Sequence, residues 1–263
     1  MKTISVVSGC YNEVENIEEF VNRVRTVFEK LPQYQFELIV IDNASTDGTS
    51  GLLRRLAAQY PWLKVILNAR NFGHIRSPYH ALLQAHGDAV IGLASDLQDP
   101  PELIPEFLAE WEHGYKAVVG VKEQSEETPV FFFARRMYYR LVHHLADIEV
   151  IQNFTGFGLF DQSIISVCRT LDDPYPYFRG IIAEIGFATA RIKYRQPIRK
   201  RGITKNNFYT LYDIAMLGIT NLSKVPLRFG PRCAHPRGVG LPRSIRLAPP
   251  TSLRLSSRLT AGD

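Results

Sequence analysis

A carboxylate and an amide, Asp96 and Gln98, stand two residues apart directly after the apolar run 89–94. This run predicts a buried strand of a parallel sheet, and Pro100-Pro101 predicts the start of a helix, since proline is tolerated in the first helical turn. Ligands of open α/β sheets lie beyond the carboxyl ends of the strands. One carboxylate and one amide oxygen suit a Mg²⁺ or Mn²⁺ ion that takes its other ligands from water and substrate phosphates. The alternative is that Asp96 only caps the following helix, because Asp is a favoured cap residue.

Alternating strands and helices must position this pair. Apolar runs predict the strands, and apolar residues at helical spacing predict the helices between them. Strands are expected at residues 3–8, 36–41, 63–67, 89–94, 117–121, 155–160 and 191–194, with helices at about 17–28, 49–56, 77–86, 101–111, 130–145, 162–171 and 207–224. This order predicts an α/β fold with a doubly wound, mostly parallel sheet and flanking helices.

Two acids are expected at the same rim of this sheet, because Asp42 ends the second strand and Asp96 follows the fourth. A dinucleotide-binding dehydrogenase would show a similar alternation of strands and helices. The first turn, residues 8–12, lacks the G-x-G-x-x-G pattern that lets a backbone approach a pyrophosphate. The sequence therefore disfavours a dehydrogenase.

Charge and cysteine content exclude further classes. The net charge of +5 comes from residues 227–263, which hold seven of the 31 basic residues and one of the 26 acidic ones. The rest of the chain is nearly neutral, so nucleic-acid binding is not expected. Cys10, Cys168 and Cys233 form no C-x-x-C pair, so neither a zinc site nor a disulfide framework is expected.

Three motifs in order along the chain resemble family 2 glycosyltransferases: Tyr11-Asn12-Glu13, Asp42 in the turn 42–49, and the run 96–102 with the sequence DLQDPPE. The resemblance is strongest to the group of dolichyl-phosphate mannose synthase and bacterial polyprenyl-phosphate glycosyltransferases, and it extends over about residues 3–226. It implies a GT-A fold in which Asp96 and Gln98 bind the metal on the donor diphosphate. The nucleotide-sugar residues that it implies are Tyr11, Asn12, Glu13, Asp42, Asn71, Ser95 and Asp96, with Tyr11, Glu13 and Asp42 at the base and ribose.

One departure from the family pattern concerns the metal. The family usually has Asp-x-Asp where this chain has Ala94-Ser95-Asp96, so the first acid is missing. This loss is expected to weaken metal or ribose contacts, while the retained Asp96 and Gln98 argue against an empty site. Gly9 also stands where the family usually has proline, a change that is expected to be minor.

The acceptor side is expected in residues 122–226. Residues 199–205, RKRGITK, match a family signature in which an arginine, a hydroxyl and a lysine surround a glycine turn, as phosphate recognition requires. A solvated turn is the alternative. The resemblance implies a set of acceptor-phosphate residues made up of Arg135, Arg179, Arg199, Thr204 and Lys205. The aromatic helix at 130–145 is expected either to pack in the core or to contact lipid, and the helix at 207–224 likewise.

The function implied is an inverting transfer of a sugar from a nucleotide diphosphate to a polyprenyl phosphate, with Asp96 and Asp99 as catalytic residues. A UDP-sugar is favoured as donor, with a GDP-sugar second, and the enzyme is expected at the cytoplasmic face of the membrane as a peripheral protein and a possible homo-oligomer. One alternative is transfer to a glycan hydroxyl, which needs a general base such as Asp99 or Glu184. Another is a nucleotide-sugar-binding protein without turnover.

The chain is expected to divide after Pro226. Residues 1–226 form the glycosyltransferase domain, with a donor half at about 1–121 and an acceptor half at about 122–226. Residues 227–263, rich in proline, glycine and arginine without apolar periodicity, are expected to be a disordered basic tail. The abrupt change in composition suggests a reading-frame shift or truncation in place of a membrane anchor, and translating the other frames of the encoding nucleotide sequence would test it.

Overall fold

The computed structural model describes residues 1–123, 151, 153–171, 173, 175–197, 216–218 and 220. The strands are β1 (Lys2–Cys10), β2 (Tyr34–Asp42), β3 (Leu63–Leu67), β4 (Ala89–Gly92), β5 (Ala117–Lys122), β6 (Phe154–Asp161) and β7 (Thr189–Tyr194). The helices are α1 (Ile17–Glu29), α2 (Thr49–Gln59), α3 (Gly73–Leu83), the 3₁₀ turn η1 (Pro101–Leu103), α4 (Ile104–Glu112), α6 (Gln162–Thr170) and α7 (Phe178–Ile185).

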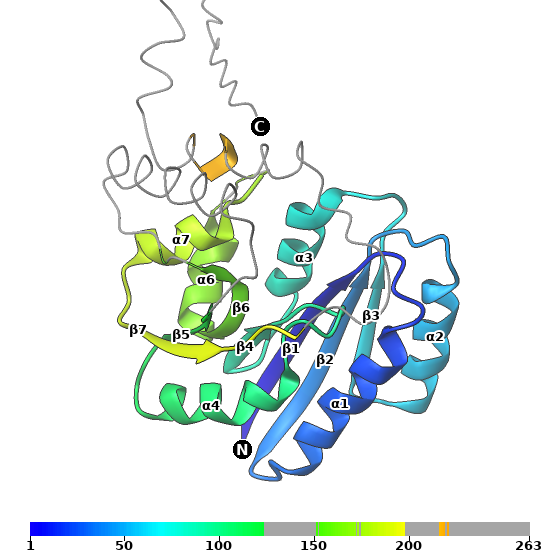
Figure 1. Cartoon of the computed structure of the whole chain (residues 1–263), viewed down its shortest axis with the longest axis horizontal. Helices are drawn as coiled ribbons and strands as arrows, with labels where there is room; N and C mark the ends of the chain where they lie inside the picture. Colours follow the sequence, from blue (N-terminus) through cyan, green and yellow to red (C-terminus); the bar gives the residue numbers. More distant parts are fainter. Residues whose placement is uncertain are drawn as a thin grey trace, which may run out of the picture. The chain divides into compact units, whose positions relative to one another are not determined.

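Within the described residues, seven strands form one sheet in the order β3-β2-β1-β4-β6-β5-β7 (Figure 1). β6 runs antiparallel to its neighbours β4 and β5, and the other neighbouring pairs are parallel. The predicted α/β class with a mostly parallel sheet is therefore confirmed. The predicted acceptor half does not form a sheet of its own, because β6 lies between two strands of the donor half and β7 extends the same sheet.

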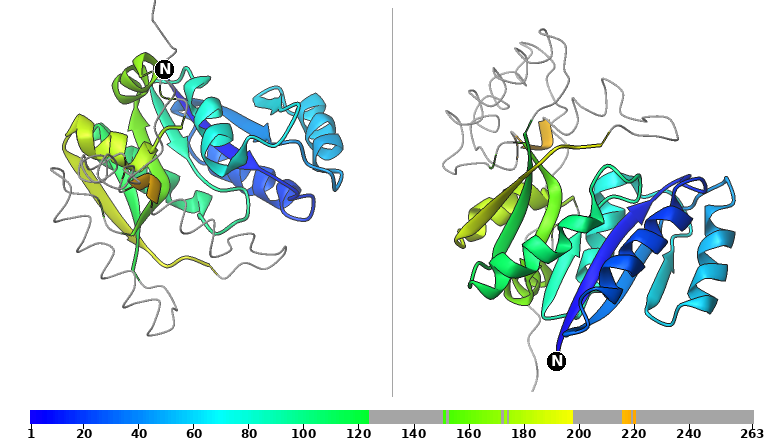
Figure 2. Two further views of the ribbon diagram at one scale, coloured as in Figure 1. Left: turned by 90° about the horizontal axis from the view of Figure 1, so that it is seen from above. Right: turned by 60° about the horizontal axis from the view of Figure 1, so that its bottom comes forward.

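Helices cover both faces of the sheet (Figure 2). α1, α2 and α4 pack on one face over alternate residues of the strands, among them Ile4, Val6 and Leu38. α3, α6 and α7 pack on the other face over the residues between these, such as Val7 and Ile39. The five inner strands of the described sheet contain runs of residues buried on both faces, so they are nearly continuous apolar runs, which is why their positions can be predicted from sequence. The outermost strands, β3 and β7, are less buried.

Two helices differ from prediction. α3 runs from Gly73 to Leu83, so it begins and ends several residues earlier than the predicted helix at 77–86. The prediction placed Pro78 in the first turn, whereas it lies inside the helix. α7 was not predicted as a helix at all. Pro78 also explains Gly9, because a Cβ at Gly9 would lie 2.8 Å from Pro78 Cγ, so this glycine makes room for the helix.

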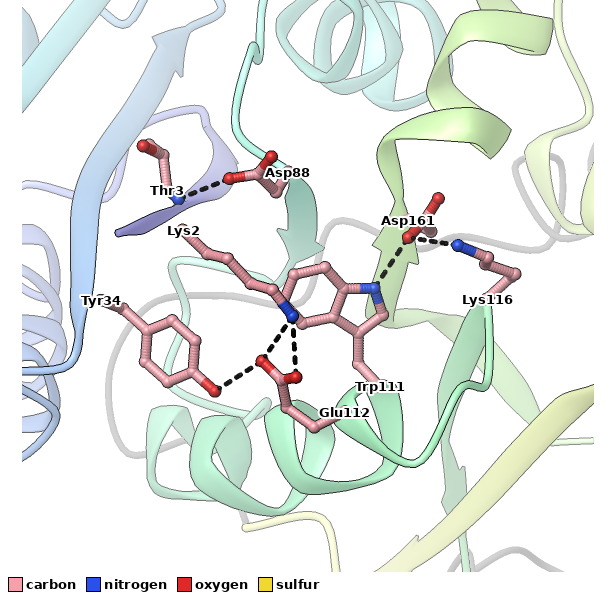
Figure 3. Close-up of polar contacts among 8 residues, drawn as sticks. All are labelled: Lys2, Thr3, Tyr34, Asp88, Trp111, Glu112, Lys116 and Asp161. Carbon is pink, nitrogen blue, oxygen red and sulfur yellow. Dashed lines mark hydrogen bonds and ion pairs between the residues drawn. The ribbon is translucent and has the colours of Figure 1, made fainter.

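A polar network joins several elements at the end of the sheet where β1 begins, opposite the carboxyl rim (Figure 3). One oxygen of Asp161, at the end of β6, accepts hydrogen bonds from Trp111 Nε1 at 2.8 Å and Lys116 Nζ at 3.1 Å. Its other oxygen caps α6 by accepting from the backbone N and the hydroxyl of Ser163, at 3.1 and 2.6 Å. Lys2 Nζ lies 4.5 Å from the centre of the Trp111 ring. Asp161 thus connects β6, α4 and α6.

Candidate functional site

Two loops at the carboxyl rim of the sheet, one after β1 and one after β2, are hydrogen-bonded to each other. The backbone N of Asn12 donates to Ser45 Oγ at 2.8 Å, and Thr46 N donates to Asn12 Oδ1 at 2.8 Å. The backbone N of Glu13 donates to Thr49 Oγ1 at 3.0 Å. Asn12 has a φ of 55°, a left-handed conformation that asparagine adopts more readily than most residues. The predicted nucleotide residues Asn12 and Glu13 are therefore held against the loop after β2 by these hydrogen bonds.

Asp42 lies at the base of these loops with 1% of its surface exposed. Its Oδ1 accepts from the backbone N of Ser45 at 3.2 Å and from the Ser45 hydroxyl, and its Oδ2 accepts from the Ser50 hydroxyl. Cys10 lies close by, and burial together with the Asp42 charge raises the pKa of its thiol, so the thiol stays protonated. Asp42 is therefore a carboxylate fixed by its own turn.

A cluster of asparagines was missed by the sequence analysis. Asn43, the buried residue after Asp42, donates from Nδ2 to Asn71 Oδ1 at 2.8 Å. Its Oδ1 accepts from Asn68 Nδ2 at 3.1 Å and from the backbone N of Phe72 at 2.8 Å. Of these residues only Asn71 had been assigned to the site. The cluster holds the loop between β3 and α3 against the end of β2, which places Asn71 at the rim.

The loop after β4 alternates in exposure. Ser95 is buried and donates from Oγ to the backbone oxygen of Gly9 at 3.1 Å, which fastens the ends of β4 and β1 together. Asp96 and Gln98 are partly exposed, and the backbone N of Gln98 donates to Asp96 Oδ1 at 3.1 Å. Leu97 between them is buried with a φ of 64°. The loop thus turns Leu97 into the core and leaves both predicted metal ligands accessible at the rim.

Asp99 faces the interior, with 7% of its surface exposed. Its Oδ2 accepts from the backbone N of Ala94 at 3.1 Å, and its Oδ1 accepts from the hydroxyl of Tyr194 at 3.0 Å. Burial raises the pKa of its carboxyl above the ordinary value. The carboxylate therefore closes the loop 94–99 and joins it to β7, a contact that the sequence analysis did not foresee.

The predicted acceptor residues lie mostly outside the described residues. Arg135, Arg199, Thr204 and Lys205 belong to this undescribed part, as do the predicted helix at 130–145, most of that at 207–224, and the tail. Arg179 is described: it lies on α7, donates from Nη1 to the backbone oxygen of Phe154 at 3.2 Å, and stacks 5.4 Å from the ring centre of Tyr177. No helix in the described part of the chain has the length and hydropathy needed to cross a bilayer.

The oxygen donors at the rim fit a divalent cation held jointly with a diphosphate. Among the described residues, no group of three or more histidine, cysteine, aspartate or glutamate side chains could hold a metal by itself. Asp96 and Gln98 offer hard oxygen ligands at the rim, and Mg²⁺ or Mn²⁺ commonly takes one or two protein ligands and completes its shell with phosphates and water. A cation at this place would therefore depend on its substrate.

The chain belongs to glycosyl transferase family 2, whose sequence model matches residues 5–168. It is 32% identical over 228 residues to the uncharacterized glycosyltransferase YkcC of Bacillus subtilis, covering 85% of this chain and 69% of that protein. It is 30% identical over 226 residues to the bactoprenol glucosyl transferase of Shigella phage SfV, covering 86% of this chain and 73% of that one.

A solved structure supports the same fold. The glucosyl-3-phosphoglycerate synthase of Mycobacterium tuberculosis, crystallised with Mn²⁺, UDP and phosphoglyceric acid, aligns with a TM-score of 0.58 over 91% of this chain and 82% of its own, at 22% identity. The family and this likeness confirm two predictions, that the protein is a family 2 glycosyltransferase and that it has the GT-A fold.

Proposed function

We propose that this enzyme transfers a sugar, with inversion, from a nucleotide diphosphate donor to a polyprenyl phosphate. The observation that carries the proposal is the 30% identity over 86% of this chain to a bactoprenol glucosyl transferase, because bactoprenol is a polyprenyl lipid. A UDP-sugar is the favoured donor, supported by the UDP bound in a structure of the same fold. A GDP-sugar is the second choice.

The donor site in this proposal is the rim built by the loops after β1, β2 and β4. Tyr11, Glu13 and Asp42 are assigned to the base and ribose, and Asn71, in the loop after β3, and Ser95 complete the proposed set of nucleotide-sugar residues. Asp96 and Gln98 hold Mg²⁺ or Mn²⁺ against the donor diphosphate, and the cation neutralises charge that develops on the leaving group. The accessibility of Asp96 and Gln98, with Leu97 buried between them, supports this assignment.

The acceptor phosphate is itself the nucleophile. A phosphate monoester has a second pKa of about 6, so it is largely dianionic near neutral pH and needs no strong general base. Arg135, Arg179, Arg199, Thr204 and Lys205 are proposed to orient it in line with the anomeric carbon. Because the acceptor is a membrane lipid, the enzyme is proposed to work as a peripheral protein at the cytoplasmic face, and self-association is a further proposal.

The geometry around Asp99 bears on the alternative acceptor, a glycan hydroxyl. Such a reaction needs a base that can reach the acceptor, and Asp99 is buried with both oxygens hydrogen-bonded inside the protein. Glu184 on α7 is exposed and remains available. Ala94 favours a second alternative, a protein that binds nucleotide sugars without turnover, because its side chain cannot ligate a metal.

The test incubates the protein with UDP-sugars and GDP-sugars, Mn²⁺ and a short-chain polyprenyl phosphate, and then isolates the lipid product. A glycosyl phospholipid is expected with one donor, with the anomeric configuration opposite to that of the donor, and EDTA should prevent its formation. Transfer to a soluble glycan alone would favour the hydroxyl acceptor. Metal-dependent donor binding without transfer or hydrolysis would favour the binding protein.

A further inference from the structure

We propose that Asp99 is a positioning residue which, through the hydroxyl of Tyr194, couples the metal-binding loop to the ends of β5 and β7. These ends are the roots of the two acceptor segments, residues 124–150 and 198–215. The loop 94–99 is closed by the Asp99 carboxylate, whose Oδ2 accepts from the backbone N of Ala94. Its Oδ1 accepts from Tyr194 OH at 3.0 Å, across 95 residues of sequence. This inference rests on the proposed function, since it concerns how donor and acceptor are brought together.

Tyr194 is well placed to carry such a coupling. It is the last residue of β7, pairs in register with Lys122 at the end of β5, and its ring packs edge-on against Phe157 at 5.2 Å between centres. Its backbone oxygen accepts from the backbone N of Glu123 at 3.0 Å. Burial and the neighbouring Asp99 raise the pKa of the Tyr194 hydroxyl, so it stays protonated and keeps donating.

The ends of β5 and β7 are followed in the sequence by the two segments that hold the predicted acceptor residues. Residues 124–150, with Arg135, continue directly from β5, and residues 198–215, with Arg199, Thr204 and Lys205, continue from β7. A second contact joins these two roots, because Lys122 Nζ donates to Gln196 Oε1 at 2.7 Å. The Tyr194–Asp99 hydrogen bond therefore links the loop that carries Asp96 and Gln98 to the base of both segments.

This arrangement gives Asp99 a role that differs from that of a general base. A base has to reach the acceptor, whereas both oxygens of Asp99 accept hydrogen bonds inside the protein. A residue of this kind sets the position of Asp96 and Gln98 relative to the acceptor. Its loss should therefore disturb the response to metal and the use of acceptor together.

The test is Tyr194→Phe, which keeps the packed ring and removes only the hydroxyl. Two quantities are measured: the gain in UDP affinity on adding Mn²⁺, by calorimetry, and the kcat and acceptor KM of transfer to a polyprenyl phosphate. Losing one hydrogen bond to a carboxylate should lower both the Mn²⁺-dependent gain and the acceptor kcat/KM by about 10- to 100-fold. UDP affinity without metal should be unchanged.

Tyr79→Phe is the matched control. Tyr79 is also buried, and its hydroxyl donates to a backbone oxygen, that of Cys168, at 3.1 Å between α3 and α6. All measured constants of this variant should stay within about twofold of wild type. If it changes them as much as Tyr194→Phe does, the effect is general destabilisation and the coupling is refuted.

Asp99→Asn completes the design. If the two residues act as one contact, the variant carrying both Tyr194→Phe and Asp99→Asn should be within about twofold of the worse single variant. Additive losses would overturn the inference. So would a near-complete loss in Asp99→Asn beside a wild-type Tyr194→Phe, since that pattern indicates a base.

The proposed function can fail separately. If the wild-type protein glycosylates no polyprenyl phosphate, the function is wrong, and the Mn²⁺-dependent gain in UDP affinity then decides the inference. An unchanged gain in Tyr194→Phe would refute the contact's role. If the wild type is active, and Tyr194→Phe lowers the Mn²⁺-dependent gain but leaves the acceptor KM at the wild-type value, then Tyr194 acts on the metal-binding loop alone. That result would refute the coupling.

Discussion

Replacing Asp161 with alanine is expected to destabilise the protein by about 3 kcal/mol. The variant loses the cap of α6, where the Asp161 carboxylate accepts from Ser163, and a lost cap costs about 1 kcal/mol. It also leaves the buried indole N–H of Trp111 without its acceptor, which costs about 1–3 kcal/mol. The partly exposed Lys116 adds less than about 1 kcal/mol.

Glu112 offers a matched control at the same end of the sheet (Figure 3). Like Asp161, it accepts from a lysine and from a neutral donor: Lys2 Nζ at 2.9 and 2.7 Å, and Tyr34 OH at 3.1 Å. Its side chain is 41% exposed, however, so water replaces the lost partners. Glu112→Ala should therefore cost less than about 1 kcal/mol.

The pH dependence provides a second test of Asp161. Burial alone would raise the pKa of its carboxyl, but the hydrogen bonds from Ser163 and Trp111 outweigh burial and lower the pKa from 3.8 to about 2. A carboxyl whose pKa is lower in the folded state than in the unfolded state stabilises the folded protein at pH values above the unfolded-state pKa. This stabilisation is lost as the pH falls through the folded-state pKa. The contribution, about 2 kcal/mol, should be present above pH ~4 and about half gone by pH ~3.

The assay is urea denaturation of wild type, Asp161→Ala and Glu112→Ala, followed by intrinsic fluorescence at neutral pH and near pH 3. The free-energy difference between wild type and Asp161→Ala should narrow on acidification. Equal destabilisation by the two substitutions, or a difference that does not change with pH, would refute the argument that burial makes Asp161 the dominant contact at this end of the sheet.

Four further outcomes are expected. Asp96→Ala should abolish transfer and the Mn²⁺-dependent gain in UDP affinity, and more than a few per cent residual activity would contradict its role as ligand. Ala94→Asp should be neutral or harmful in the same assay, because the rest of the loop keeps the family pattern, and a clear gain would overturn that. Arg199→Ala or Lys205→Ala should lower acceptor efficiency by about 10- to 100-fold with donor affinity intact, whereas a collapse of donor affinity would assign the run to the donor diphosphate. Gly158→Ala should destabilise the protein by about 1–3 kcal/mol in urea denaturation, because the added Cβ would clash with the backbone oxygen of Val118. A variant with the wild-type denaturation midpoint would contradict that clash.

The inner strands could be predicted because strands that are buried on both faces are nearly continuous apolar runs in the sequence. β3 was placed to the residue, and β1 and β2 to within two residues at each end. The order of the strands in the sheet has no such local signal in the sequence. That β6 would enter between β4 and β5 depends on contacts between residues far apart in sequence, such as Val90 with Phe160. α7 is short and contains Gly180, so its apolar spacing was too brief to indicate a helix.

The candidate site also contains residues that could be predicted from local sequence and residues that could not. Asp42 and Asp96 were predicted at one rim because each follows a strand, and the structure places both there. Asn43 and Asn68 were missed, although the polar turn after Asp42 was visible, because asparagines in a turn are common without forming a cluster. Tyr194 could not have been found, since nothing near it in sequence indicates that its hydroxyl meets Asp99.

The position of β6 has a consequence for synthesis of the chain. β5 pairs with β6 and β7, both of which follow it by many residues, and β4 has β6 as its second neighbour. When residues 1–123 have left the ribosome, β1, β2 and β3 can already pair, but β4 presents an open edge and β5 has no partner strand to join. An exposed strand edge is a site for pairing with other chains. A fragment ending near Glu123 should therefore aggregate, and we expect that the loops proposed to bind the nucleotide cannot be produced as a separate soluble module.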